Sequence, residues 1–278
     1  MGKEGKPMAS IVKNQNLPPL PACELSVSYS ETTRKTHRFQ IDNHCHDCCE
    51  IYVNVTGDVS FMVEETLYPV SHGDAVITKP WEHHHCVYRS DRPHKHYWLL
   101  FSAESEALYP HFFDREPGKR NLISLPADQK EVLVALCQSL LEDAKDDLGR
   151  YADFFAMQRL LAHGAAHSHG KASALPEELA AMLAYAADAA PGELCAASLA
   201  EAGHVSLSTA ERLFREYIGL TPLKYITEKR FDKARALLKS GKNVTEAALE
   251  SGFCDSSYFI LQFRKRYAIT PNAFRRQP

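Results

Sequence analysis

The chain has 278 residues, enough for two domains, and 45% of them are hydrophobic, so each domain can bury a core. No run of about 18 apolar residues is present, and the charged, proline-rich start MGKEGKPMASIVKNQNLPPLPAC is unlike a signal peptide, which argues against membrane and secreted classes. The formal net charge is −3, but charge is unevenly distributed along the chain: residues 205–278 contain 14 Lys and Arg against 7 Asp and Glu. A basic C-terminal segment on an acidic protein is typical of phosphate binding. Eight cysteines without a secretion signal favour reduced thiols, so we expect a cytoplasmic protein.

Residues 24–102 are predicted to form β-structure, after a poorly ordered start over residues 1–19. The segments ELSVSYS, EIYVNVTGDVSFMVEETLYPV, DAVITKP and HYWLLFS alternate or run apolar, with Gly57, Gly73 and Pro80 between them. Short strands separated by tight turns predict a small antiparallel barrel or sandwich over residues 20–125.

The segment HCHDCCE at residues 44–50 packs possible metal ligands into one predicted strand. Alternate residues of a strand share a face, so one face carries His44, His46, Cys48 and Glu50, and the other carries Cys45, Asp47 and Cys49. Two imidazoles and a carboxylate on one face are either metal ligands or hydrogen-bond partners of a polar molecule.

Helical periodicity begins after the β-region. In residues 126–165, Val132, Leu136 and Leu140 recur every four positions, which predicts an αα-hairpin that covers the barrel or forms a dimer interface. Residues 166–174 are small and polar and are expected to be a linker. Residues 175–278 are predicted to be helical, and capping-box spacing marks two helix starts, Ser198 with Glu201 and Asn243 with Glu246.

The C-terminal segment contains an internal repeat at a constant shift of 49 residues. The matching residues are Glu201, Gly203, Ser208, Phe214, Arg215, Thr221 and Pro222 with Glu250, Gly252, Ser257, Phe263, Arg264, Thr270 and Pro271. LAEAGHVSLSTAERLF and ALESGFCDSSYFILQF each have the pattern helix, glycine-containing turn, helix, which is typical of the DNA-binding helix-turn-helix.

Residues 194–276 resemble the DNA-binding domain of the AraC/XylS family of bacterial transcription regulators. The strongest match is GFCDSSYFILQFRKRYAITPNAFRR at 252–276, and RFDKARALL matches the helix that links the two units in that family. The resemblance implies a regulator that binds promoter DNA, with recognition helices at 206–217 and 255–267 in adjacent major-groove segments.

The faces of these two helices indicate which residues read DNA. Ala210, Leu213, Phe214 and Tyr217 form the expected buried stripe of the first helix, and Phe259 and Phe263 anchor the second. Arg212 is our candidate for base readout, and Arg215 and Arg264 are expected to contact phosphates. The full set of candidates is Ser206, Ser208, Thr209, Arg212, Arg215, Ser256, Ser257, Tyr258, Gln262, Arg264 and Lys265. Two departures from the family pattern are Leu261, opposite Arg212 in the repeat, and Ala268, where the first unit keeps Gly219.

The N-terminal half resembles the cupin-type effector domain common in this family. His44, His46 and Glu50, followed by Gly57, match the first cupin motif, and by comparison with the family His84 is the later histidine. The resemblance implies either a pocket for a small molecule, commonly a sugar, or a divalent metal such as zinc, nickel, iron or manganese. The second motif is imperfect, because Trp81 stands after the proline where glycine is usual. We favour the organic effector, with His44, His46, Glu50, Tyr52, Trp81 and His84 as candidate contacts; His44, His46, Glu50 and His84 are the candidate metal ligands.

Together these features predict an α+β multidomain protein: an N-terminal cupin or jelly-roll β-barrel with a helical hairpin, and an all-α domain with two helix-turn-helix units. We expect a homodimeric regulator, an activator, whose partners are promoter DNA, a small-molecule effector and RNA polymerase. A cupin enzyme would use the same ligands, but an isomerase or dioxygenase has no use for a duplicated helix-turn-helix, so no catalytic residues are predicted.

Overall fold

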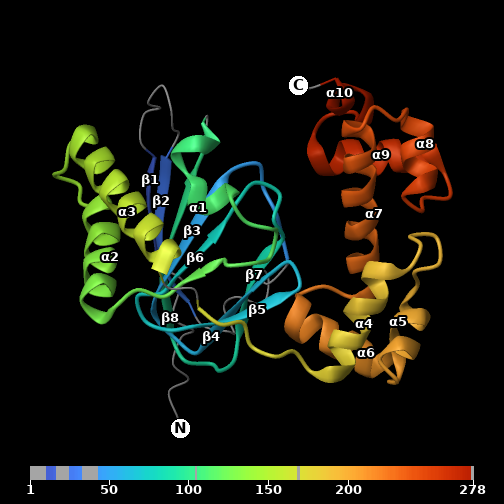
Figure 1. Cartoon of the computed structure of the whole chain (residues 1–278), viewed down its shortest axis with the longest axis horizontal. Helices are drawn as coiled ribbons and strands as arrows, with labels where there is room; N and C mark the ends of the chain where they lie inside the picture. Colours follow the sequence, from blue (N-terminus) through green and yellow to red (C-terminus); the bar gives the residue numbers. More distant parts are fainter. Residues whose placement is uncertain (1–10, 17–24, 33–42, 104, 168–169, 277–278) are drawn as a thin grey trace, which may run out of the picture. The chain divides into compact units, whose positions relative to one another are not determined.

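The protein folds as two compact units, Met1–Ala174 and Leu175–Pro278. A computed structural model describes residues 11–16, 25–32, 43–103, 105–167 and 170–276. It confirms the predicted fold class, because the N-terminal unit is built on β-sheets and the C-terminal unit on helices (Figure 1). Among the described helices, none has the length and apolar character needed to span a bilayer.

The N-terminal unit contains two antiparallel sheets, with strand orders β1-β2-β8-β3-β6-β9 and β5-β4-β7. The strands are β1 Ile11–Asn16, β2 Leu25–Thr32, β3 Cys49–Thr56, β4 Val59–Val63, β5 Thr66–Val70, β6 Ala75–Thr78, β7 His84–Tyr88, β8 His94–Phe101 and β9 Leu122–Ile123. In the described residues the two sheets are separate ladders, so the domain is a two-sheet sandwich rather than one closed barrel. Strand β7, which contains two of the three consecutive histidines, lies at an edge of the smaller sheet.

The six-stranded sheet has one apolar face and one mixed face, on which buried polar side chains stand beside Tyr52, Val76 and Leu122. The apolar face packs on helices α2 (Ala127–Leu140) and α3 (Asp147–His167), which lie together on one side of the sheet in Figure 1. This core includes Val27, Cys49, Ile51, Val53, Leu99, Phe101, Leu133, Phe154 and Leu161. Strand alternation turns the other face toward the small sheet, where the buried polar side chains include Ser28, Ser30, Thr32, Glu50, Asn54, Thr78, His94 and His96.

Two expected segment boundaries need correction. Residues 11–16 of the supposedly poorly ordered start form β1, which pairs along its whole length with β2; the rest of 1–19 lies outside the described residues. The expected linker at 166–174 is largely part of the N-terminal unit. Helix α3 runs on to His167, and the N–H groups of Gly170 and Ser173 donate to the carbonyls of Leu122 and Leu67.

The C-terminal unit is helical, and α7 joins two helix-turn-helix units. Its elements are α4 Glu177–Asp188, α5 Ala196–Ala202, α6 Leu207–Leu213, the π-helical turn η2 Phe214–Ile218, α7 Pro222–Lys239, α8 Val244–Glu250, α9 Ser256–Tyr267 and α10 Pro271–Arg275. The second unit packs α8, α9 and α10 against α7 through an aromatic core in which Phe231 contacts Phe253, Phe259 and Phe263.

One of the two predicted capping boxes is confirmed. At the start of α8, Asn243 Oδ1 accepts from the Glu246 N–H at 2.9 Å and Glu246 Oε2 accepts from the Asn243 N–H at 3.1 Å. At α5 the prediction is wrong, because the capping residue is Cys195. Its sulfur accepts from the Ser198 N–H at 3.3 Å, so Ser198 is the third residue of the helix rather than its cap.

The two helix-turn-helix units differ by one residue in their turns. The C-cap, left-handed residue and N-cap are Gly203, His204 and Ser206 in the first unit, and Ser251, Gly252 and Asp255 in the second. The C-caps are therefore 48 residues apart and the N-caps 49 apart. The shift of 49 is confirmed from the recognition helices onward, whereas Gly203 and Gly252 are not equivalent. A Cβ on Gly203 would lie 2.8 Å from Met182 Cγ, so this glycine allows α4 to approach closely.

A buried ion pair holds the loop before β7. Glu82 and Arg115 are both buried, and the Arg115 Nη1 and Nη2 groups donate to the two Glu82 oxygens at 2.7 and 2.5 Å. Glu82 also accepts from the backbone N–H groups of Lys79 and Gly118. Burial acts to raise the pKa of Glu82, but its hydrogen bonds with Arg115 and the Arg115 charge outweigh burial and lower the pKa. This loop leads directly into His84.

Replacing Glu82 by Gln should lower the free energy of unfolding by roughly 3 kcal/mol at pH 7, because Arg115 is left buried without its counter-charge. Since the folded pKa of Glu82 lies below its ordinary value of 4.5, the stabilisation is fully present above pH 4.5 and is lost as the pH falls toward the lowered pKa. The difference between wild type and Glu82→Gln in urea unfolding should therefore shrink on acidification. Glu116→Gln, at the exposed position that follows Arg115 in the chain, is the control. Equal stability of wild type and Glu82→Gln at pH 7 would contradict the role of the pair.

Replacing Ala268 by Gly should stabilise the C-terminal unit by roughly 0.5–1 kcal/mol, because left-handed backbone is unfavourable for alanine. Ala268 has φ 57°, and the equivalent Gly219 has φ 73°. Gly219→Ala, the matched reverse change, should destabilise by about 1 kcal/mol. Urea unfolding followed by circular dichroism measures both, and a loss of stability in Ala268→Gly would show that the turn needs the alanine side chain.

Candidate functional site

The four predicted metal ligands come together at one end of the sandwich. One ligand atom from each of His44, His46, Glu50 and His84 lies within 4.8 Å of the others, and we call this group the His3Glu cluster. Donor atoms about 2.1 Å from a shared ion are at most about 4.2 Å apart, so only a small contraction separates this arrangement from a coordination sphere.

Two separate pieces of chain supply the cluster, residues 44–50 and the start of β7. Glu50 stands near the start of β3, and His84 begins β7. His44 pairs with His84 through two backbone hydrogen bonds, His44 N–H to His84 O at 3.2 Å and His84 N–H to His44 O at 2.9 Å. Residues 44–48 are not a strand, so the expected strand alternation is not what gathers these ligands. The bridge to β7 and the bend before β3 do so instead.

Backbone carbonyls set the orientation of two of the histidine rings. His46 Nδ1 donates to the Cys48 carbonyl at 3.0 Å, and His84 Nδ1 donates to the Glu82 carbonyl at 2.8 Å. A neutral imidazole with its hydrogen on Nδ1 has its lone pair on Nε2. Both Nε2 atoms face the same oxygen, Glu50 Oε2, at 3.0 and 3.2 Å. His46 Nε2, His84 Nε2 and Glu50 Oε2 can each accept a hydrogen bond. Their close approach is favourable only when protons or a cation lie between them.

The electrostatics of the cluster favour positive charge. Burial lowers the pKa of His46, but hydrogen bonds to Cys48 and Glu50 outweigh burial and raise it to about 10. Burial acts to raise the pKa of Glu50, yet the charge of His84 and hydrogen bonds from both histidines hold it well below its usual range. Cys48 lies outside the cluster, since its sulfur is 3.3 Å from His46 Nδ1, across the ring from Nε2.

Two further predicted effector contacts lie nearby with their groups already engaged. Tyr52 shares the inner face with Glu50, but its hydroxyl hydrogen-bonds with His94 Nε2 at 2.7 Å, and its ring packs on Phe61. Trp81 is half-buried and its backbone N–H donates to the His46 carbonyl at 2.8 Å. It has φ 68°, so it keeps the left-handed backbone for which the family motif uses glycine.

Sequence reasoning missed most of the polar inner face. His94, His96 and Trp98 alternate along β8 and their rings form a continuous series, with centroids 4.5 Å and 5.2 Å apart. The Ser28 and Ser30 side chains of β2 stand opposite Trp98 and His96. The alternation of polar residues in SVSYSET and HKHYW carries this signal, although our prediction of strands in these segments does not assign the residues to an inner face.

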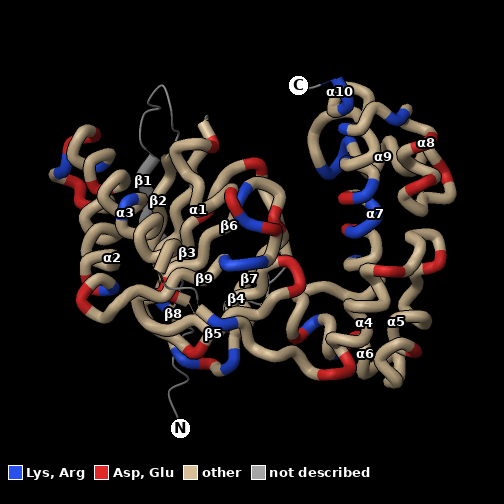
Figure 2. Tube along the Cα trace, in the orientation of Figure 1, with Lys and Arg blue, Asp and Glu red and all other residues tan. Residues whose placement is uncertain are grey.

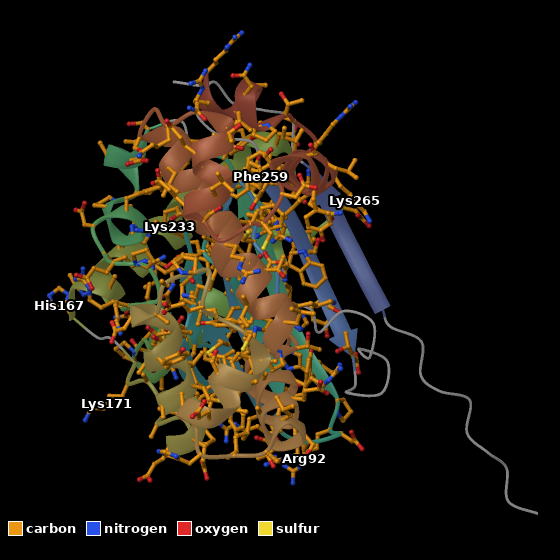
Figure 3. All side chains as sticks on the ribbon, turned by 90° about the vertical axis from the view of Figure 1, so that its right-hand side faces the viewer. Arg92, His167, Lys171, Lys233, Phe259 and Lys265 are labelled. Carbon is orange, nitrogen blue, oxygen red and sulfur yellow. The ribbon has the colours of Figure 1, made fainter. Side chains whose placement is uncertain are left out.

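The candidate DNA-reading residues occupy the outer sides of the two recognition helices. Most of the predicted stripe is buried, with Ala210, Leu213 and Phe214 no more than 5% exposed and Phe259 and Phe263 fully buried, whereas Tyr217 is only half-buried. The exposed candidates are Ser206, Ser208, Arg212, Arg215, Ser257, Tyr258, Arg264 and Lys265; Thr209, Ser256 and Gln262 are half-buried. Figure 3 labels Phe259 and Lys265 of α9 and Lys233 of α7.

Some of these side chains already have local partners. Ser206 caps α6, with its hydroxyl accepting from the Thr209 N–H at 3.2 Å. Arg212 donates to Glu216 at 2.9 Å across one helical turn, with both side chains largely exposed. Leu261, which stands where Arg212 does in the first unit, is 63% exposed. Figure 2 shows Lys and Arg spread along α7, α9 and α10, whereas α8 carries acidic residues.

Family models and relatives match both halves of the chain. An AraC-like ligand binding domain matches residues 24–163, just over half of the chain, and a helix-turn-helix domain matches residues 199–277. The HTH-type transcriptional activator RhaS of Salmonella arizonae is 37% identical over 95 residues, and the match spans 34% of each chain, about a third of that relative's length.

Solved structures with similar sequences match the C-terminal unit. An AraC-type DNA-binding regulator from Chromobacterium violaceum is 31% identical, covers 36% of this chain and 94% of that one, and has a TM-score of 0.34. The DNA-binding domain of AdpA, solved with a target DNA, is 28% identical, covers 36% of this chain and 91% of that one, with a TM-score of 0.34. The ligand-binding and helix-turn-helix matches account for both units: the chain belongs to the AraC/XylS family of DNA-binding transcriptional regulators.

Proposed function

We propose that the N-terminal domain of this regulator senses its effector through a divalent metal ion held by the His3Glu cluster. The observation that carries the proposal is the convergence of His46 Nε2, His84 Nε2 and Glu50 Oε2, with each Nδ1 hydrogen held by a backbone carbonyl. Such outer hydrogen bonds orient histidines for metal binding. Three imidazoles and one carboxylate suit zinc, nickel, iron or manganese.

A metal at this cluster would join residues 44–50 to the edge strand β7, two pieces of chain that backbone and side-chain hydrogen bonds connect here. His44 belongs to the segment before β3, Glu50 to β3 and His84 to the edge strand β7. Binding of an ion to the folded domain would stabilise this arrangement in proportion to its affinity. We propose that this change in the effector domain alters binding of the C-terminal unit to promoter DNA.

The polar inner face favours a second candidate, a small polar organic effector such as a sugar. Asn54 and Thr78 are buried on this face, and Asn54 Oδ1 and Thr78 Oγ1 have no hydrogen-bond partner among the described residues. Thr78 stands directly opposite Glu50 in the sheet register. Buried polar atoms are ordinarily satisfied, so oxygen or hydroxyl groups of a ligand would find partners here. A metal ion and such a ligand are compatible, because the ion would hold ligand oxygens beside this face.

We propose that Arg212 reads a base, while Arg215 and Arg264 contact phosphates. Arg212 lies on the outer side of α6 with a flexible, exposed salt bridge to Glu216, which DNA can displace at small cost.

An activator role is supported by the match to RhaS, named as an activator, and RNA polymerase is then the downstream partner. For homodimerisation we propose the outer side of the hairpin, where Val132 of α2 and Leu148 of α3 are 52% and 80% exposed.

Elemental analysis of the purified full-length protein should find about one divalent transition metal per chain, because the cluster offers four donors to one ion. His46→Ala should lose most of that metal, because it removes one of the two imidazoles that face Glu50 Oε2. His72→Ala, which removes an exposed histidine outside the cluster, should retain it. Metal-free wild-type protein after growth in metal-supplemented medium would refute the metal and leave the organic effector.

Arg212→Ala should weaken binding to an operator selected from random-sequence DNA and relax specificity at one base pair, by roughly 1–3 kcal/mol. Arg215→Ala should instead weaken binding about equally for operator and unrelated DNA and reduce the salt dependence. Fluorescence anisotropy with both DNAs separates the two behaviours. Unchanged affinity and specificity in Arg212→Ala would show that the first recognition helix has been assigned wrongly.

A further inference from the structure

The outer side of helix α9 is more apolar than its role as a recognition helix requires. The large hydrophobic side chains that are exposed in the described residues include three from this helix, Tyr258, Ile260 and Leu261. Leu261 is the most exposed of the three, at 63%. The packing of α9 on α7 is made by Phe259 and Phe263, on the other side of the helix. Leu261 therefore contributes little to the core of its own unit.

Leu261 occupies the centre of the outer side of α9. Successive residues of an α-helix are about 100° apart around the axis, so Leu261 lies about 180° from the midpoint between the buried Phe259 and Phe263. Arg264 and Lys265, both exposed, follow about one helical turn later, one on each side of Leu261. An apolar side chain thus stands between two cations on the surface that α9 offers to a partner.

The same place in the first unit belongs to Arg212. The N-caps of α6 and α9 are Ser206 and Asp255, 49 residues apart, and Arg212 and Leu261 are each the sixth residue after their cap. Both helices are regular up to this point, because the π-helical turn of the first unit begins only at Phe214. Leu261 is therefore positioned to meet a base edge wherever α9 enters the major groove.

Leucine at such a position can recognise one feature of a base. The base edges in the major groove present hydrogen-bond donors and acceptors, and the apolar group among them is the C5 methyl of thymine. Beside any other base, Leu261 would displace water from a polar group without replacing the lost hydrogen bond, which is unfavourable. Beside thymine, the leucine side chain and the methyl group leave water together, which is favourable.

We propose that Leu261 is a specificity-determining residue that packs on the C5 methyl of a thymine, while Arg264 and Lys265 hold the phosphates on either side. The proposal rests on the proposed function, in which both recognition helices enter the major groove. It gives the second unit a base preference of its own, made by apolar contact rather than by hydrogen bonds. The thymine lies about one turn of the DNA from the base pair that Arg212 reads.

Replacement of thymine by deoxyuridine tests the contact, because it removes the methyl group and leaves base pairing intact. An operator is selected from random-sequence DNA with the full-length protein, and each of its thymines is then replaced singly. Fluorescence anisotropy should show binding about fourfold weaker at one thymine, the effect of burying one methyl group. An operator in which no thymine responds would overturn the proposal. Relaxed specificity in Arg212→Ala on that same DNA would then show that DNA recognition by the first unit still holds.

Three variants assign the effect to this side chain. Leu261→Ala, which suits an exposed helix position, should bind the thymine and deoxyuridine operators alike. Leu261→Met keeps an apolar side chain of similar volume and should keep the difference of about fourfold. Leu249→Ala makes the same change as the first variant at a leucine of α8 that is 57% exposed, and it should also keep the difference.

Two results with these variants would contradict the contact. The first is a full response to deoxyuridine in Leu261→Ala protein whose melting temperature is that of the wild type. The second is wild-type DNA binding by Leu261→Ala together with lost activation of transcription, which would assign Leu261 to a protein contact instead.

Discussion

The alternation of side chains along β3 is the constraint on which the effector domain depends. Cys49, Ile51 and Val53 enter the hydrophobic core beneath α2 and α3, and the residues between them face the smaller sheet. A slip of one residue would place Glu50 in that core and turn the core residues toward the smaller sheet, so the register is strongly specified. The same packing that stabilises the domain therefore aims Glu50 at the histidines. The direction of Glu50 and the packing of the core are two consequences of one strand register, whereas the bridge to β7 brings in the histidines.

The C-terminal unit contains two helix-turn-helix units that are not identical in structure. Both recognition helices bury aromatic or apolar stripes and leave polar residues outward. The first unit carries Arg212 and ends in a π-helical turn, whereas the second carries Leu261 and has a turn one residue longer. These differences change both the side chains presented and the geometry that presents them. We infer that the first unit contributes most of the base-specific hydrogen bonds and the second contributes apolar and phosphate contacts.

Local pattern predicts most of the strands, the helices and the buried stripes, because each follows from periodicity within about ten residues. The ligand set was predicted by motif resemblance, although the expected strand at 44–48 is wrong: the bridge between His44 and His84 joins residues 40 apart. For the same reason, local pattern does not predict the hydrogen bond between the Tyr52 hydroxyl and His94, which lies 42 residues away in the chain. The extra residue in the second turn could not be predicted, because Gly203 and Gly252 align in the sequence although their backbone angles differ. Apolar alternation does not mark strand β7, because its first two residues are His84 and His85, and only the family resemblance places a strand there.

The central claim is that histidine and glutamate side chains, and not the neighbouring cysteines, form a metal centre in the effector domain. X-ray absorption spectroscopy at the metal edge of the purified full-length protein tests it most directly. We expect a first shell of nitrogen and oxygen at about 2.0–2.2 Å with the multiple-scattering pattern of imidazole. A shell dominated by sulfur at about 2.3 Å would contradict the account, because the ligands would then be Cys45 or Cys48 thiolates.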